Sequence, residues 1–141
     1  MGKRILVIEP SPTLRAIFAM YFERDEHQFV QFEDYEAAIQ AQPRFQAEPP
    51  ELAFVALDAR CPASFHSLSR VRGLYAQTKL IVMVAQEESD RLDVQNLLRM
   101  TQAIPLLKPF SIREVLNLLA DVGPMTTVAA SIPSAERSTN A

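Results

Sequence analysis

The sequence predicts an α/β fold in which helices cover both faces of a doubly wound, five-stranded parallel sheet, giving three layers. Five short apolar runs alternate with five segments of helical periodicity along the chain. The runs are continuously apolar, as in parallel strands that are buried on both faces. Strands separated by helices pair in parallel through right-handed crossovers. The chain has 141 residues and 48% hydrophobic content, enough for one core, so we expect one domain.

The chain opens with a strand, a tight loop and a helix. Residues 5–8 form the apolar run Ile-Leu-Val-Ile and predict a strand buried on both faces. Ser11 then supplies a helix N-cap, and Pro12 occupies the first helical position, where proline is favoured. The helix itself is predicted from the apolar stripe of Leu14, Ile17, Phe18 and Tyr21.

The middle of the chain repeats this alternation. Residues 29–32 predict the second strand and residues 34–41 the second helix, before a proline-rich loop. Residues 52–57 and 80–85 predict the third and fourth strands. A third helix between them is predicted beyond Pro62 from the spacing of Phe65, Leu68, Val71 and Leu74.

The last elements carry a break and a boundary signal. Residues 91–100 predict the fourth helix, and residues 104–107 predict a short fifth strand. We expect Pro105 to interrupt this strand, because proline has no backbone N–H to donate. Ser111 and Glu114 have the spacing of a capping box, which marks the start of the last helix.

The C-terminal part of the chain lacks apolar periodicity. From residue 123 onward Thr, Ala, Ser and Pro dominate, a composition typical of disordered tails and linkers. We therefore expect a domain at residues 1–122 and a disordered tail or linker stub at residues 123–141.

Charge and cysteine content exclude several functions. The net charge of -3 leaves no basic surplus for a nucleic-acid backbone, so no nucleic-acid partner is expected. Cys61 is the single cysteine, so no intrachain disulfide forms, and no Cys and His cluster has zinc-site spacing. The apolar runs are strand-sized and no signal-peptide core is present. We expect a cytoplasmic protein with no membrane partner.

Charged residues stand at three predicted strand ends. Glu9 follows the first strand, Asp58 follows the third, and Lys108 ends the fifth. Because the carboxyl ends of parallel strands meet at one edge of a sheet, we expect these side chains to converge there. The chain has three glycines, Gly2, Gly73 and Gly123. Neither a P-loop nor a dinucleotide-binding turn is therefore present, and a nucleotide-dependent enzyme is disfavoured.

Three spaced segments match the pattern of one known family. Residues 5–13 combine an apolar strand, an acidic residue at its end and a Ser-Pro-Thr helix start. Asp58 is followed four positions later by Pro62, and residues 108–110 read Lys-Pro-Phe. Together, over about residues 3–119, they resemble the receiver domains of two-component response regulators. The resemblance implies the flavodoxin-like strand order 2-1-3-4-5.

The resemblance also implies a chemistry and its residues. Family members accept a phosphoryl group from a phosphohistidine or a small acyl phosphate, here on Asp58 as phosphoacceptor. Lys108 would neutralise the phosphoryl oxygens, and the Lys108–Pro109 bond is expected to be cis. A magnesium ion would be held by Glu9, Asp58 and the backbone carbonyl of Arg60. The implied partners are a histidine kinase or phosphotransfer protein, a protein target at the face of the fourth and fifth helices, and a second copy in a homodimer.

Four positions depart from the family pattern. Pro10 stands where the family has a second metal-binding carboxylate, so the magnesium site is predicted to be weak. Ala85 stands at the switch position and lacks the hydroxyl that would bind the phosphoryl group. Pro105 replaces an aromatic residue on the fifth strand, and His66 replaces a glycine. Several losses in one site indicate a degenerate receiver.

Two functions remain open. The first is a receiver-like signalling module of a phosphorelay, with Asp58 as phosphoacceptor and an impaired metal site and switch. The alternative is a phosphorylation-independent pseudo-receiver, a protein–protein interaction module, which Pro10, Ala85 and Pro105 favour. Between them the sequence favours signalling by protein contact, and in both readings the chain is no enzyme.

Overall fold

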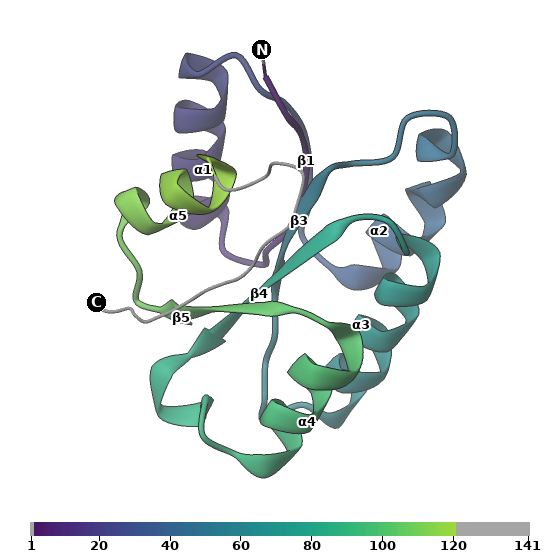
Figure 1. Cartoon of the computed structure of the whole chain (residues 1–141), viewed down its shortest axis with the longest axis vertical. Helices are drawn as coiled ribbons and strands as arrows, with labels where there is room; N and C mark the ends of the chain where they lie inside the picture. Colours follow the sequence, from purple (N-terminus) through teal and green to yellow (C-terminus); the bar gives the residue numbers. More distant parts are fainter. Residues whose placement is uncertain (1, 121–141) are drawn as a thin grey trace. The chain divides into compact units, whose positions relative to one another are not determined.

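A computed structural model describes residues 2–120 of the chain (Figure 1). These residues divide into two units, with the boundary between Phe110 and Ser111. The tail expected at residues 123–141 lies outside the described residues. Over residues 2–120, no helix has the length and apolar character needed to cross a membrane.

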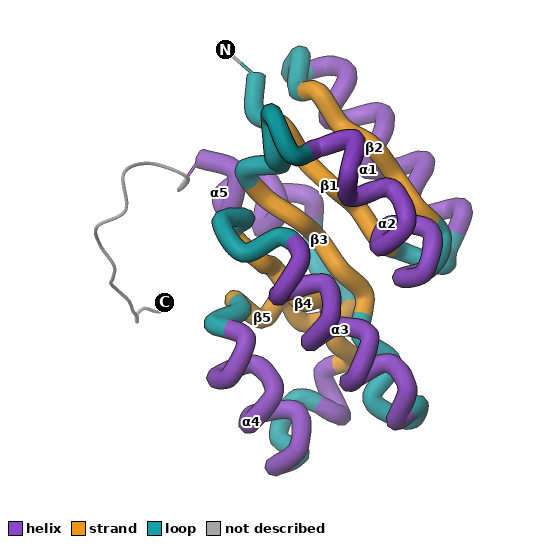
Figure 2. The backbone as a smooth tube through the Cα atoms, turned by 90° about the vertical axis from the view of Figure 1, so that its right-hand side faces the viewer, coloured by secondary structure: helices purple, strands orange, loops and turns teal. Residues whose placement is uncertain are grey.

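A parallel sheet forms the centre of the first unit (Figure 2). In its described part the sheet has five strands in the order β2-β1-β3-β4-β5, and every neighbouring pair is parallel. The strands are β1 (Arg4–Ile8), β2 (Gln28–Phe32), β3 (Leu52–Ala56), β4 (Lys79–Ala85) and β5 (Ile104–Lys108). The predicted fold class and strand order are confirmed. Strand order reverses beside β1, so the loops after β1 and β3 diverge and leave room for a site.

Helices cover both faces of this sheet (Figures 1 and 2). The helix α1 (Pro12–Arg24) lies on one face. On the opposite face lie α2 (Tyr35–Ala41), α3 (Pro62–Leu74) and α4 (Leu92–Thr101). The predicted N-cap of α1 forms, because the Ser11 hydroxyl accepts a hydrogen bond from the Leu14 N–H at 3.2 Å.

Alternate residues of the strands build a separate core on each face. Leu6, Val55 and Val82 belong to the cluster under α2, α3 and α4. On the other face, the rings of Phe18 and Phe22 pack against Phe54 with centroids 5.5 and 6.0 Å apart. All of β3 is buried, as its continuous apolar sequence predicts. Asp58 therefore follows a strand that is fixed by packing on both of its faces.

The fifth strand corrects one expectation. It runs without a break from Ile104 to Lys108, and Pro105 lies opposite Val82 of β4. The predicted interruption is wrong because β5 is an edge strand in the described sheet. An edge strand needs N–H donors on one side only, so a proline whose nitrogen faces outward leaves the ladder intact. Pro105 is accordingly exposed.

The described part of the second unit is the helix α5 (Ile112–Ala120). Its predicted capping box forms. The Ser111 N–H donates to a Glu114 carboxylate oxygen at 3.0 Å, and the Glu114 N–H donates to the Ser111 hydroxyl at 3.3 Å. Val115 and Leu119 are buried on the apolar stripe of this helix.

Candidate functional site

The carboxyl ends of the strands surround a cavity of about 770 Å³. Asp58, two residues beyond β3, and Lys108, the last residue of β5, both line it. Pro10 and Ala85 form part of its apolar wall. The cavity lining also carries six carboxylates, those of Glu33, Asp34, Glu36, Asp58, Glu87 and Glu88. Arg60 and Lys108 are the cationic side chains of this described lining, so the cavity is strongly acidic.

Glu9, the residue directly after β1, has a buried side chain whose two carboxylate oxygens both have hydrogen-bond partners. It is 1% exposed. One carboxylate oxygen accepts a hydrogen bond from the Lys108 ammonium at 2.8 Å, and the other accepts from the Ser11 N–H at 2.9 Å. Both oxygens of Glu9 are thus already engaged. A buried carboxylate needs such partners because transfer from water removes its hydration.

The backbone around Glu9 is equally constrained. Its N–H donates to the Phe32 carbonyl at 3.0 Å, which continues the pairing of β1 with β2. The Arg15 guanidinium donates to the carbonyls of Glu9 and Pro10 at 2.7 and 3.2 Å. These contacts hold the loop between β1 and α1 in one shape. Nothing in the sequence pattern indicated this role for Arg15.

Lys108 is the last residue of β5, which lies at the edge of the described sheet, with β3 and β4 between it and β1. Its side chain is about one third exposed, and its ion-pair partner is Glu9. The peptide bond between Lys108 and Pro109 is cis, as the resemblance implied. In the pairing of β4 with β5, Lys108 lies opposite Ala85. At the position that the resemblance assigns to the switch, a methyl group therefore stands in place of a hydroxyl, opposite Lys108 in the strand pairing.

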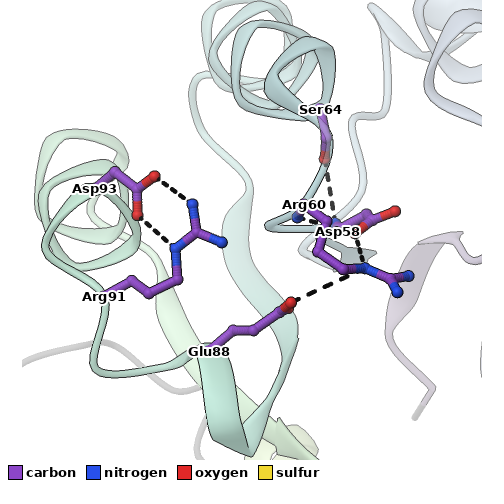
Figure 3. Close-up of polar contacts among 6 residues, drawn as sticks. All are labelled: Asp58, Arg60, Ser64, Glu88, Arg91 and Asp93. Carbon is purple, nitrogen blue, oxygen red and sulfur yellow. Dashed lines mark hydrogen bonds and ion pairs between the residues drawn. The ribbon is translucent and has the colours of Figure 1, made fainter.

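Asp58 lies in a different environment from Glu9 (Figure 3). Its side chain is half exposed, and its carboxylate accepts hydrogen bonds from the backbone N–H and the guanidinium of Arg60, at 3.0 and 3.2 Å. These bonds, the backbone one foremost, lower the pKa of Asp58 from its ordinary value. The Asp58 N–H donates to the Ser64 hydroxyl at 3.3 Å. Asp58 therefore pairs with Arg60 and not with Lys108.

The side chain of Arg60 was not anticipated, since the sequence indicated only its carbonyl. Its guanidinium lies 3.2 Å from Asp58 and 4.0 Å from Glu88, in the 3-10 turn after β4. Arg91 pairs with Asp93 at 2.7 Å at the start of α4, separately from this group (Figure 3). A basic residue two positions after the acid was the available sequence signal.

Tyr35 closes another side of the cavity. Its hydroxyl donates to the Ala56 carbonyl at the end of β3, and burial raises its pKa well above the ordinary value. The hydroxyl therefore stays protonated and acts as a fixed donor that ties α2 to β3. The sequence pattern did not single out this residue.

The donor set does not fit a magnesium ion in this arrangement. Over residues 2–120, no three His, Cys, Asp or Glu side chains lie together as a metal site. Both oxygens of Glu9 are occupied, Pro10 offers no side-chain oxygen, and the carboxylate of Asp58 turns to Arg60. Magnesium requires near-octahedral oxygen ligands and loses its waters reluctantly. The magnesium site predicted from Glu9, Asp58 and the Arg60 carbonyl stays a prediction, and the geometry argues against it.

Comparison with known proteins identifies the fold. Neither family models nor curated proteins match this chain. Solved structures do. A response regulator from Thermotoga maritima is 19% identical with a TM-score of 0.69, the match covering 86% of this chain and 98% of that protein.

Two further structures carry ligands or modifications. The receiver domain of a sensor histidine kinase from Pseudomonas aeruginosa, solved with magnesium in its active-site cleft, is 19% identical with a TM-score of 0.64 and covers 84% of this chain and 95% of that one. A response regulator from Burkholderia pseudomallei with a phosphorylated aspartic acid is 18% identical with a TM-score of 0.66, covering 84% of this chain and 66% of that one. The chain has the fold of response regulator receiver domains.

Proposed function

We propose that this chain is a receiver-like signalling module that transmits its signal by protein contact and has no catalytic turnover of its own. The observation that carries the proposal is the ion pair between the buried carboxylate of Glu9 and Lys108. The cation that the resemblance assigned to a phosphoryl group is held by an internal carboxylate, 2.8 Å away. The fold is thus retained, while the side chains that the resemblance assigns to phosphoryl transfer contact other protein groups: Lys108 contacts Glu9, and Asp58 contacts Arg60.

The charge of the cavity supports the same conclusion. A phosphoryl group adds a charge of about −1.5 to −2 at neutral pH. At Asp58 it would share the cavity with Glu33, Glu87 and Glu88, which also line it. Arg60 is the cation that contacts Asp58, and its side chain is 80% exposed. Without a metal ligand set, a phosphoryl group at this position is poorly neutralised.

The exposed carboxylate of Asp58 favours a second candidate, a receiver of a phosphorelay. Like any exposed aspartate it is ionised at neutral pH, and an ionised carboxylate is the nucleophile that the reaction needs. An Asp58 oxygen would form a bond to phosphorus as the bond to the donor breaks, and the donor leaves with that electron pair. A histidine kinase or phosphotransfer protein would supply the group. The phosphorylated aspartic acid in the Burkholderia structure supports this route by analogy.

The target surface is proposed to include the outer side of α4. Leu92 and Met100 on this helix are large apolar side chains that are 75% and 79% exposed. They suit a protein target or, as the homodimer expectation has it, a second copy. The cytoplasmic location expected from the sequence belongs to the same proposal.

The deciding experiment offers the protein a phosphoryl donor and a phosphoryl mimic. The full chain is incubated with magnesium and acetyl phosphate, or with beryllium fluoride, and is followed by intact mass and amide NMR. Asp58→Ala removes the acceptor, and Asp25→Ala is the matched control, an aspartate that pairs with Arg24 and does not line the cavity. We expect no Asp58-dependent mass increase and no shifts. A mass increase that Asp58→Ala abolishes, with shifts spreading to α4, would establish the phosphorelay receiver instead.

A further inference from the structure

We propose that Glu9 is the residue that decides what this site binds: its carboxylate holds the Lys108 ammonium as an internal cation and thereby excludes divalent cations. The inference rests on the proposed function only in treating the cavity as the signalling site. It assigns Glu9 a positive role, as the partner that commits Lys108. The exclusion of divalent cations then has two causes, the missing second carboxylate at Pro10 and the commitment of Glu9 to Lys108.

The distance across the sheet shows why a glutamate is needed. Glu9 follows β1 and Lys108 ends β5, and the strands β3 and β4 lie between them. Three strand spacings amount to about 14 Å. The two side chains nevertheless meet at 2.8 Å, so both must extend along the carboxyl edge of the sheet. An aspartate on the same backbone would be shorter by one carbon–carbon bond, about 1.5 Å, so its oxygen would lie beyond hydrogen-bond distance of the ammonium unless Lys108 moved.

The surroundings of Glu9 fix the direction in which it extends. The Ser11 N–H binds one carboxylate oxygen, and Arg15 binds the carbonyl of Glu9 itself. The other oxygen is thereby presented to Lys108. With Glu9 only 1% exposed, its negative charge requires a counter-charge from the protein, and the ammonium supplies it.

A divalent cation would have to displace this arrangement. It would compete with a covalently attached ammonium that needs no association from solution, and with the Ser11 N–H on the second oxygen. It would gain little in return, because Pro10 offers no side-chain oxygen and Asp58 is engaged with Arg60. Each member of the pair should therefore restrain the other. Shortening Glu9 should release Lys108, and removing the Lys108 ammonium should open Glu9 to a cation.

The first test observes the Lys108 ammonium directly. The chain has three lysines, Lys3, Lys79 and Lys108, so lysine-selective ¹⁵N labelling of the full protein gives a simple spectrum. The Lys108 signal is assigned by its loss in Lys108→Gln. We expect this ammonium to be protected from solvent exchange in the wild type and unaffected by millimolar magnesium. In Glu9→Asp it should lose its protection.

A matched control shortens a different glutamate. Glu51 pairs with Arg4 at 3.2 Å and is partly exposed. Glu51→Asp should leave the Lys108 signal unchanged. Protection of Lys108 that survives Glu9→Asp, or a wild-type Lys108 signal that moves as magnesium is added, would overturn the inference.

The second test measures cation binding by the partner left behind. In Lys108→Met the ammonium is lost while most of the side-chain volume remains. Manganese should then broaden the amide signals of Glu9 and Asp58 at concentrations about tenfold or more below those needed for the wild type. Equal binding by a folded Lys108→Met protein would overturn the exclusion. If this variant does not fold, the Glu9→Asp measurement still decides. Both tests omit any phosphoryl donor, so their failure is distinguishable from failure of the proposed function.

Discussion

The carboxyl edge of the sheet holds two acid–base pairs of similar chemistry and opposite environment. Glu9 and Lys108 meet at 2.8 Å with the carboxylate buried, whereas Asp58 and Arg60 meet at 3.2 Å with Asp58 half exposed and Arg60 mostly exposed. Coulomb attraction is screened by water in the second pair and much less in the first. The same combination of charges therefore has different consequences at two points about one cavity.

This difference in exposure makes Glu9 and Lys108 a structural pair and allows Asp58 and Arg60 to exchange partners. Glu9 cannot lose Lys108 without leaving a charge out of water, so the pair holds β1 and β5 together across the sheet end. Asp58 can exchange Arg60 for water or another partner at little cost, because exposed pairs contribute little to stability. A ligand or partner that binds at this cavity should therefore displace the pair of Asp58 and Arg60 more easily than the pair of Glu9 and Lys108.

Removing Lys108 should have the largest effect. Lys108→Ala leaves Glu9 buried without its counter-charge, and we expect the free energy of unfolding to fall by about 3 kcal/mol or more. Urea unfolding monitored by circular dichroism measures it. Arg60→Ala is the matched control on the exposed pair and should leave the unfolding midpoint unchanged. Equal midpoints for the two variants would contradict the distinction between the pairs.

Removing the charge of Glu9 should cost less than removing Lys108. In Glu9→Gln the amide can still accept from the Ser11 N–H, and the Lys108 ammonium, one third exposed, can turn to water. We expect a loss of about 1–2 kcal/mol in the same urea experiment. The double variant Glu9→Gln with Lys108→Met should be more stable than Lys108→Ala alone. A double variant as unstable as Lys108→Ala would show that packing, and not charge, dominates.

The sequence predicted the fold well because the fold depends on periodic signals. Continuous apolar runs such as residues 5–8 and 52–57 are typical of strands buried on both faces, and the capping box at Ser111 reflects local backbone bonding. Pro105 was misjudged because its effect depends on whether its strand lies at the edge. That property belongs to the sheet and not to the segment.

The site was less predictable, for a physical reason. Sequence reasoning named Glu9, Asp58, Lys108 and Arg60 from strand ends and from the resemblance. It could not assign Lys108 to Glu9, because that choice depends on the width of two intervening strands and the length of both side chains. The local pair of Asp58 and Arg60 had a sequence signal, since its members are two residues apart.

His27, directly before the amino end of β2, should give a pH dependence of stability that does not come from the site. His27 accepts a hydrogen bond at Nδ1 from the Lys3 N–H, and burial lowers its pKa below the ordinary 6.5. The unfolded chain therefore binds a proton more readily than the folded one. The stabilising effect is complete above about pH 6.5 and is lost as the pH falls through the folded pKa.

The experiment compares urea unfolding of the wild type and His27→Gln between pH 5 and pH 8. We expect the wild type to lose stability toward pH 5 and the variant to lose less. The same slope in both proteins would place the pH dependence elsewhere, with the carboxylates of the cavity as the first alternative.

The smallest predicted effect concerns Asp58 alone. The backbone N–H and guanidinium of Arg60 lower the pKa of Asp58, so Arg60→Ala should raise it toward its ordinary value by removing the side-chain bond while the backbone bond remains. Carboxyl ¹³C NMR during an acid titration measures this shift. The stability that depends on ionised Asp58 is present above its unfolded pKa and is lost as the pH falls through the folded one. Because the backbone bond is the larger cause, the shift should be partial. Complete reversal would show that the guanidinium dominates, and Arg60 would then control the charge of Asp58.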